Sequence, residues 1–234
     1  MPNEDTHDKL YWHFIRSDGH FTRDLANVKA EVGQTLCRDE HDPMPCYYGL
    51  HASERALDAL NYAPGTMACL VTLGGKIVHD KDDGDKVAAQ RRTIVAMADV
   101  EKELHEFALW CAERALQHIS NPDVTKAALD AKRAWLRGEM DDDALDAAAE
   151  AVWDLAHSTS ESDLVKSVAY TVYYAASRQA AEGAIYASSD ACSAATCAAD
   201  GEDDQLEDAA HYAKLDAMLR EALGVSEPAD TLSS

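Results

Sequence analysis

TMACLVTLGGKIVHDKDDGDKVAAQRRTIVAM, residues 66–97, is the stretch that decides the fold of the first half of this chain. Residues 66–73 are an apolar run of strand length, which predicts a buried strand. Gly74 and Gly75 predict a turn, after which residues 76–80 continue that strand or pair with it. Residues 81–86 are a charged loop, and the Thr-Ile-Val run favours a further strand over 91–96.

The residues before this stretch predict short strands and one helix. An alternating aromatic run at 10–16, a short run at 31–36 and another at 47–52 each predict a strand. Residues 53–63 place apolar side chains on one helical face, with Ser53 as the N-cap and Pro64-Gly65 ending the helix. Residues 1–97 therefore predict a small α+β domain with a mixed sheet.

Beyond residue 97 the chain is rich in alanine, and its apolar residues keep helical spacing. We predict helices over 98–119, from Asn121-Pro122 to Gly138, from 141 onward, over 161–187 or on to 199, and over 203–223. Ser160 with Asp163 resembles a capping box for the fourth of these. The fold class is thus α+β: a small mixed sheet domain over 1–97, an Ala-rich, acidic antiparallel helical bundle over 98–224, and a flexible tail over 225–234.

The charge of the chain is strongly negative and unevenly spread. The 234 residues carry a net charge of −22. Residues 1–97 hold 11 Lys and Arg against 15 Asp and Glu, whereas residues 98–234 hold 10 against 28. Direct binding to nucleic acid needs clustered cations, so this balance argues against it. An acidic surface suits a basic partner protein, or else it serves solubility alone.

The ends and the cysteines of the sequence indicate a soluble, intracellular protein. The N-terminal residues MPNEDTHDKL do not have the pattern of a signal peptide. The sequence has no apolar run of the roughly 18 residues that a membrane helix needs, so we expect no membrane association. The six cysteines have irregular spacing, which predicts free thiols, with Cys69 and Cys111 in the core.

A cluster of cysteine and histidine raises a zinc hypothesis. The stretch TLCRDEHDPMPCYYGLHAS, residues 35–53, contains Cys37, His41, Cys46 and His51. Two thiolates and two imidazoles suit tetrahedral zinc, but this set lacks the tight C-x2-C or H-x3-H pairs of well-defined sites. A turn-rich loop leading into a strand is the alternative. Cys46 and His51, five residues apart in an extended segment, point to opposite faces, which argues against a nucleophile–base pair.

Three further segments point to a family. The segments GLHASERALDALNYAPGTMACLVTLGGKI, KVAAQRRTIVAMAD and FALWCAERAL occur in this order. Together they resemble an uncharacterised family of phage and prophage proteins, in which a C-x-x-GLHAS α+β domain precedes an Ala-rich helical tail. Cys46, Gly49 and His51 match positions of that family, whereas a plain turn stands at Cys37 and His41 in its other members. The resemblance implies a viral or mobile-element origin and a role in host interaction.

An enzymatic alternative rests on the order of elements around GLHAS. A strand, this motif, a helix and a buried strand resemble part of an ADP-ribosyltransferase fold, in which such residues hold NAD. The resemblance would give the role of holding NAD to His51, Ser53 and Tyr62, and the role of acting on its ribose to Gln90. A likeness of topology alone does not establish an activity.

The leading functional expectation is a non-catalytic inhibitor without metal or cofactor. Its acidic helices would imitate nucleic acid, and so bind and block a host protein with a basic surface. The protein would then act in the host cytoplasm as an anti-CRISPR or other anti-defence protein. Asp143, Asp146 and Glu150 have helical spacing on one face. The full set of candidate partner-binding carboxylates is Asp141, Asp142, Asp143, Asp146, Glu150, Glu202, Asp203, Asp204, Glu207 and Asp208. An Ala-rich helical face could also form a homodimer.

Overall fold

The computed structural model describes residues 9–81, 84–158, 161–199 and 204–226. The described residues fall into two compact units, one within Met1–Val100 and Leu215–Ser234 and the other within Glu101–Lys214. The boundary thus lies at 100/101, three residues beyond the predicted one. In addition, the C-terminal segment, predicted as part of the helical domain and a tail, groups with the N-terminal unit.

The first unit is a five-stranded sheet whose pairings are all antiparallel among the described residues. The predicted α+β class is confirmed, with an antiparallel sheet in place of a mixed one. The strand order is β1-β4-β5-β2, with β3 also pairing to β5. The strands are β1 (Tyr11–Ile15), β2 (Thr35–Cys37), β3 (Leu50–Ala52), β4 (Met67–His79) and β5 (Val87–Asp99).

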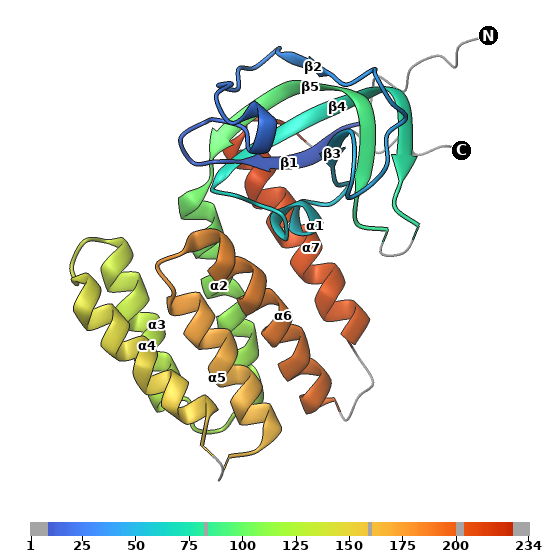
Figure 1. Cartoon of the computed structure of the whole chain (residues 1–234). Coiled ribbons are helices and arrows are strands. Elements are labelled where there is room, and N and C mark those ends of the chain that lie inside the picture. Colours follow the sequence, from blue (N-terminus) through green and yellow to red (C-terminus); the bar gives the residue numbers. More distant parts are fainter. Residues whose placement is uncertain (1–8, 82–83, 159–160, 200–203, 227–234) are drawn as a thin grey trace. The chain divides into compact units, whose positions relative to one another are not determined.

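The two long strands β4 and β5 form the hairpin on which the sheet is built (Figure 1). The prediction that Gly74 and Gly75 turn the chain is wrong, because both lie inside β4. The register shifts there, between Gly74 and Ile77, as in a β-bulge. Gly75 has a φ of +71°, and a Cβ on it would lie 2.8 Å from Gln90 Oε1, so glycine is needed at this bulge.

The sheet curls back on itself at Trp12 and Ser53. The backbone N–H of Trp12 donates to the Ser53 carbonyl at 2.7 Å, and the Ser53 N–H donates to the Trp12 carbonyl at 2.9 Å. This bridge joins the end of β3 to β1 and closes a small barrel through β4 and β5. Ser53 is therefore not the predicted helix cap. The short helix α1 (Ala56–Leu60) begins after Arg55, without a side-chain cap.

The core of the first unit fills the inside of this curled sheet with residues from β1, β4 and β5, including Tyr11, Ile15, Val71 and Ile94. Cys69 is fully buried there, as predicted. Trp12 is also fully buried. Its indole Nε1–H donates to Asp216 at 2.6 Å, which ties the end of the last helix to β1.

The second unit is helical throughout its described elements, in agreement with the sequence (Figure 1). Gly138 and Gly224, each with positive φ, follow the ends of two of the helices as predicted. The 3-10 segments are η1 (Arg23–Leu25), in the first unit, and η2 (Leu116–His118). The helices are α2 (Glu101–Ala115), α3 (Asp123–Leu136), α4 (Asp142–Ala156), α5 (Asp163–Ala176), α6 (Ala180–Ala198) and α7 (Asp204–Ala222), of which the last runs on into residues of the first unit.

The predicted single helix over 161–187 or on to 199 is instead two helices, α5 and α6. Ser177 has an extended backbone, with ψ of 143°, and ends α5. Gly183 then permits a close approach of the two helices, because a Cβ on it would lie 2.7 Å from the Tyr174 carbonyl oxygen. Ser162 caps α5 by accepting from the Val165 N–H, whereas Ser160 lies outside the described residues.

Two predictions about the whole chain can be compared with the structure. All six cysteines are described, and all six are free. In the described parts of the chain, no helix combines the length and the apolar character needed to span a bilayer.

Candidate functional site

A cavity of about 440 Å³ lies in the first unit, between β1, β3, β5 and the segments 21–25 and 46–49. Its volume is in the usual range of small-molecule sites, roughly 300–1,000 Å³. The wall is rich in cations, unlike the chain as a whole: Arg23, Arg38, Lys86 and Arg92 all line it. Asp24 is the one carboxylate among the described lining residues, and it is paired with Arg38.

Arg92 is the most buried of these cations. It faces Leu73 across the β4–β5 pair, so its side chain enters the same face as that core residue. It is 4 % exposed, lies over the Phe21 ring and donates through one terminal nitrogen to the His51 carbonyl at 2.6 Å. Burial lowers the pKa of Arg92 to about 10, which leaves it charged at neutral pH.

The residues that the structure describes supply no counterion for this buried charge. Among the described residues, Arg92 makes no ion pair, and its Nε has no hydrogen-bond partner. A buried charge without a partner is strongly unfavourable. Because it borders a cavity, an anionic group of a ligand placed there would supply the missing partner.

Two histidines accompany Arg92 in the cavity wall. Burial, and then the charge of Arg92, hold the pKa of His13 well below its usual value, and the same two causes lower the pKa of His51. Both rings are therefore neutral at pH 7, when each can accept one hydrogen bond and donate another. The Nε2 of His51 is buried without a partner among the described residues.

Two residues with a strained backbone conformation also line the cavity. Arg23 and Cys46 are the two non-glycine residues with positive φ in the described chain, at 56° and 69°, and both line the cavity. Such conformations are unfavourable for L-residues and concentrate at functional sites. Cys46 Sγ also accepts from Lys86 Nζ at 3.2 Å, and that ammonium lies over the Tyr62 ring.

The structure brings together three of the four residues of the transferase alternative. His51, Ser53 and Tyr62 line the cavity. Tyr62 is half-exposed and donates to Asp85 at 2.5 Å. Gln90 is not among the lining residues, because its amide oxygen accepts from the Lys76 N–H at the bulge in β4.

The four residues of the zinc hypothesis do not form a ligand set. Within the described ranges, no group of three or more His, Cys, Asp or Glu side chains is placed to hold a metal ion. Cys37 is exposed in β2, and His41 packs edge-on against Tyr48. Cys46 and His51 do line the same cavity, although the sequence placed them on opposite faces. The left-handed backbone at Cys46 breaks the extended alternation that this interpretation assumed.

The candidate partner-binding carboxylates fall into three groups. Five make interactions within the second unit. Asp141 caps α4, Asp142 and Asp146 pair with Arg178, Glu207 pairs with Arg114, and Asp208 accepts from Cys192 at 2.9 Å. Asp143 and Glu150 are exposed on α4. Glu202 and Asp203 lie outside the described residues, as does the side chain of Asp204.

The second unit also holds a buried polar cluster that the sequence did not predict. Ser188 Oγ lies 2.8 Å from His211 Nδ1, and His211 Nε2 lies 3.2 Å from Glu207, which Arg114 holds through two hydrogen bonds. This Ser-His-Glu arrangement resembles a catalytic triad of nucleophile, base and acid. However, Ser188 is 3 % exposed and His211 is fully buried, so a substrate cannot reach them. We assign the cluster a structural role.

The residues that sequence reasoning missed in the cavity are His13, Arg23, Arg38, Lys86 and Arg92. For His13 the alternating pattern of residues 10–16 contained a signal, since it puts a polar ring on the same face as the core residues Tyr11 and Ile15. For the four cations the sequence contained no such signal. The loop conformations and the strand register that bring them together are set by tertiary structure.

Comparison with known proteins adds one finding. No curated protein and no solved structure matches the chain. Residues 19–106 match the model of a domain of unknown function, DUF7666, and this range includes every residue of the cavity wall from Phe21 to Arg92. The predicted resemblance to an uncharacterised family is thus supported over this range.

Proposed function

We propose that the first unit binds a phosphate-bearing small molecule in its cavity, with Arg92 as the main contact to the anion. The observation that carries this proposal is the buried guanidinium of Arg92, which makes no ion pair among the described residues and whose Nε has no hydrogen-bond partner there. Hydrogen bonds between a guanidinium and a phosphate are charge-assisted and often bidentate, so a phosphate would satisfy the donors that the protein leaves free. Arg23, Lys86 and the two neutral histidines would hold the remaining oxygens.

A dinucleotide is the member of this class that links the cavity to the transferase alternative. Its pyrophosphate suits the cations, and His51, Ser53 and Tyr62 would contact the rest of the molecule. Binding of NAD alone does not imply that the protein transfers ADP-ribose. Incubation with labelled NAD and a host lysate separates the two, because a transferase labels a protein and a binding protein does not.

Replacing Arg92 tests the binding proposal directly. We expect Arg92→Met to weaken binding of pyrophosphate, ADP-ribose or NAD by about 30- to 100-fold, which corresponds to the roughly 2–3 kcal/mol of a charge-assisted contact. Isothermal titration calorimetry at low and moderate salt measures the change. Arg91→Met is a matched control, because Arg91 is exposed, adjacent in sequence and outside the cavity wall.

Three results would contradict the proposal. The first is a folded Arg92→Met protein, checked by circular dichroism, that binds as tightly as the unchanged protein. The second is the absence of binding by all three compounds at millimolar concentration. If Arg91→Met weakens binding equally, the effect comes from net charge and the cavity is not the site.

We infer, as a second candidate, that the protein is a phage-encoded accessory protein that binds a basic host protein in the host cytoplasm, such as a nucleic-acid-handling defence component. Asp143, Glu150 and Asp154 favour this reading. All three are exposed on α4 and, among the described residues, none makes an ion pair. Their spacing of seven and four residues places them on one helical face. This face suits a cationic partner.

Charge reversal tests this second candidate. We expect Asp143→Lys combined with Glu150→Lys to abolish capture of the host partner on an affinity resin, because repulsion replaces attraction. Glu31→Lys with Glu221→Lys changes the net charge equally at other exposed positions, and it should leave capture intact. Added salt should release the partner from the unchanged protein. If the protein with both α4 charge reversals still captures the host partner, the second candidate function is wrong.

A further inference from the structure

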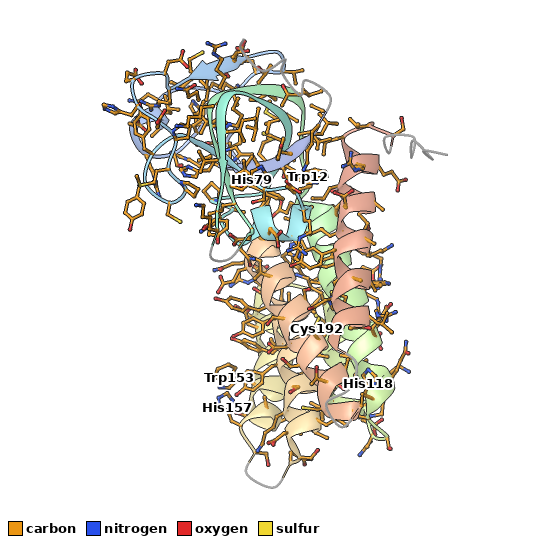
Figure 2. The ribbon with its side chains drawn as sticks, turned by 90° about the vertical axis from the view of Figure 1, so that its right-hand side faces the viewer. Trp12, His79, His118, Trp153, His157 and Cys192 are labelled. Carbon is orange, nitrogen blue, oxygen red and sulfur yellow. The ribbon has the colours of Figure 1, made fainter. Side chains whose placement is uncertain are left out.

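The second unit carries a continuous row of aromatic side chains, which we call the aromatic strip. It runs across α4, α5 and α6, and each ring contacts the next, with centroids 3.9–6.0 Å apart. Figure 2 shows two of its members, Trp153 and His157, side by side at the end of α4. The strip consists of Trp153, His157, Tyr170, Tyr173, Tyr174 and Tyr186.

The strip is open to solvent at both ends. Trp153 is 38 % exposed and Tyr186 is 44 % exposed, and both are among the large hydrophobic side chains that the protein leaves uncovered. Exposed Trp and Tyr residues that lie together are typical of binding hot spots rather than of a solvated helix face. Their ring faces carry partial negative charge, which attracts cations.

Carboxylates surround the end of the strip formed by Tyr174 and Tyr186. Glu182 and Asp190 lie four residues before and after Tyr186 on α6, so all three share one helical face. Both carboxylates also raise the pKa of Tyr174, after the larger effect of burial. The pKa of Asp190 is itself raised to about 6 by burial.

The cations of this part of the protein do not neutralise these carboxylates. Arg178, between α5 and α6, is engaged by Asp142 and Asp146 on α4. Asp190 makes no ion pair with any residue that the structure describes. The strip therefore ends in stacked rings beside a half-buried carboxylate for which the described residues supply no counterion.

We propose that this end of the aromatic strip, formed by Tyr174, Tyr186 and Asp190, binds an arginine side chain of a basic partner protein. A guanidinium stacks on aromatic faces and pairs with a carboxylate in the same plane, whereas a lysine ammonium, being compact and strongly hydrated, gains less from the rings. The proposal rests on the second candidate function, and it names both the surface and the side chain that would be recognised.

The test uses the full chain and short labelled peptides. In fluorescence anisotropy we expect hexa-arginine to bind more tightly than hexa-lysine, and hexa-glutamate not to bind. Tyr186→Ala and Asp190→Asn should each weaken hexa-arginine binding by about tenfold. Glu31→Gln removes one exposed charge, as Asp190→Asn does, and this control should not change the affinity.

Three other outcomes would overturn the inference. Equal losses in Asp190→Asn and Glu31→Gln would mean that only net charge matters. Loss of binding in the Asp143→Lys and Glu150→Lys protein, without loss in the strip variants, would leave the second candidate function standing and remove the strip from it. If the strip instead joins two copies of the chain, sedimentation will show a dimer that Tyr186→Ala dissociates and that hexa-arginine leaves unchanged.

Discussion

Trp12→Ala is expected to lower the free energy of unfolding of the first unit by about 3–5 kcal/mol, the usual range for removing a buried large aromatic side chain. Trp12 is fully buried, and its backbone forms the bridge to Ser53 that closes the barrel. Its indole also donates to Asp216, while the Arg220 guanidinium lies over the ring. Alanine would leave a cavity at the closure and remove the anchor of the C-terminal segment.

Denaturation in urea, followed by far-ultraviolet circular dichroism, measures this loss. Hydrogen exchange of the β4 amides that face β1 localises it to the first unit. Trp12→Phe is the informative comparison, because it keeps most of the aromatic volume and removes only the donor to Asp216. We expect that variant to lose about 1–2 kcal/mol. A change below 1 kcal/mol for Trp12→Ala would show that the barrel closure contributes little to stability.

The fold was predictable where local pattern and tertiary structure agree. The alternating residues 10–16, the apolar run from Met67 and the Ala-rich helices have the predicted structures because each element buries the face that its sequence marks. The Gly74-Gly75 pair was misread because a bulge and a turn use the same glycine conformation. Only the pairing with β5 distinguishes them. The break at Ser177 likewise follows from packing between α5 and α6, since its local sequence favours continued helix.

The candidate site was less predictable, and Arg91 and Arg92 show why. The two residues are adjacent in one strand and identical in type. Arg91 is exposed beside Asp39, whereas Arg92 is buried against Phe21. Which of the two enters the barrel depends on strand register, and a shift by one residue would exchange them. The acidic residues of α4 were predicted as free to bind a partner, but Arg178 pairs with two of them. A run of aspartates in the sequence does not reveal such a pairing.

Lys132 is expected to make the stability of the protein rise with pH in the alkaline range. It is fully buried, donates from Nζ to the Ser177 carbonyl at 2.5 Å and lies over the Trp135 ring. Burial lowers the pKa of Lys132 from 10.5 to about 8, with Glu101 opposing this effect and Arg178 adding to it. Between these two values the unfolded chain holds a proton that the folded chain has released. Raising the pH through this window therefore stabilises the folded state, by about 3 kcal/mol for a shift of this size.

Comparison with Lys132→Met isolates this effect, because other groups titrate in the same range. Burial raises the pKa of Cys69 and of Cys111, so both thiols favour the unfolded state as the pH rises. These contributions are common to both proteins and cancel in the difference. The free energy of unfolding of the unchanged protein, minus that of Lys132→Met, should increase by about 3 kcal/mol between pH 7.5 and 10.5. Lys126→Met, at an exposed position of the same helix, should give a difference that does not vary with pH. A difference for Lys132→Met that is equally flat would mean that the buried ammonium keeps its ordinary pKa, and that water or the Ser177 carbonyl compensates its burial in full.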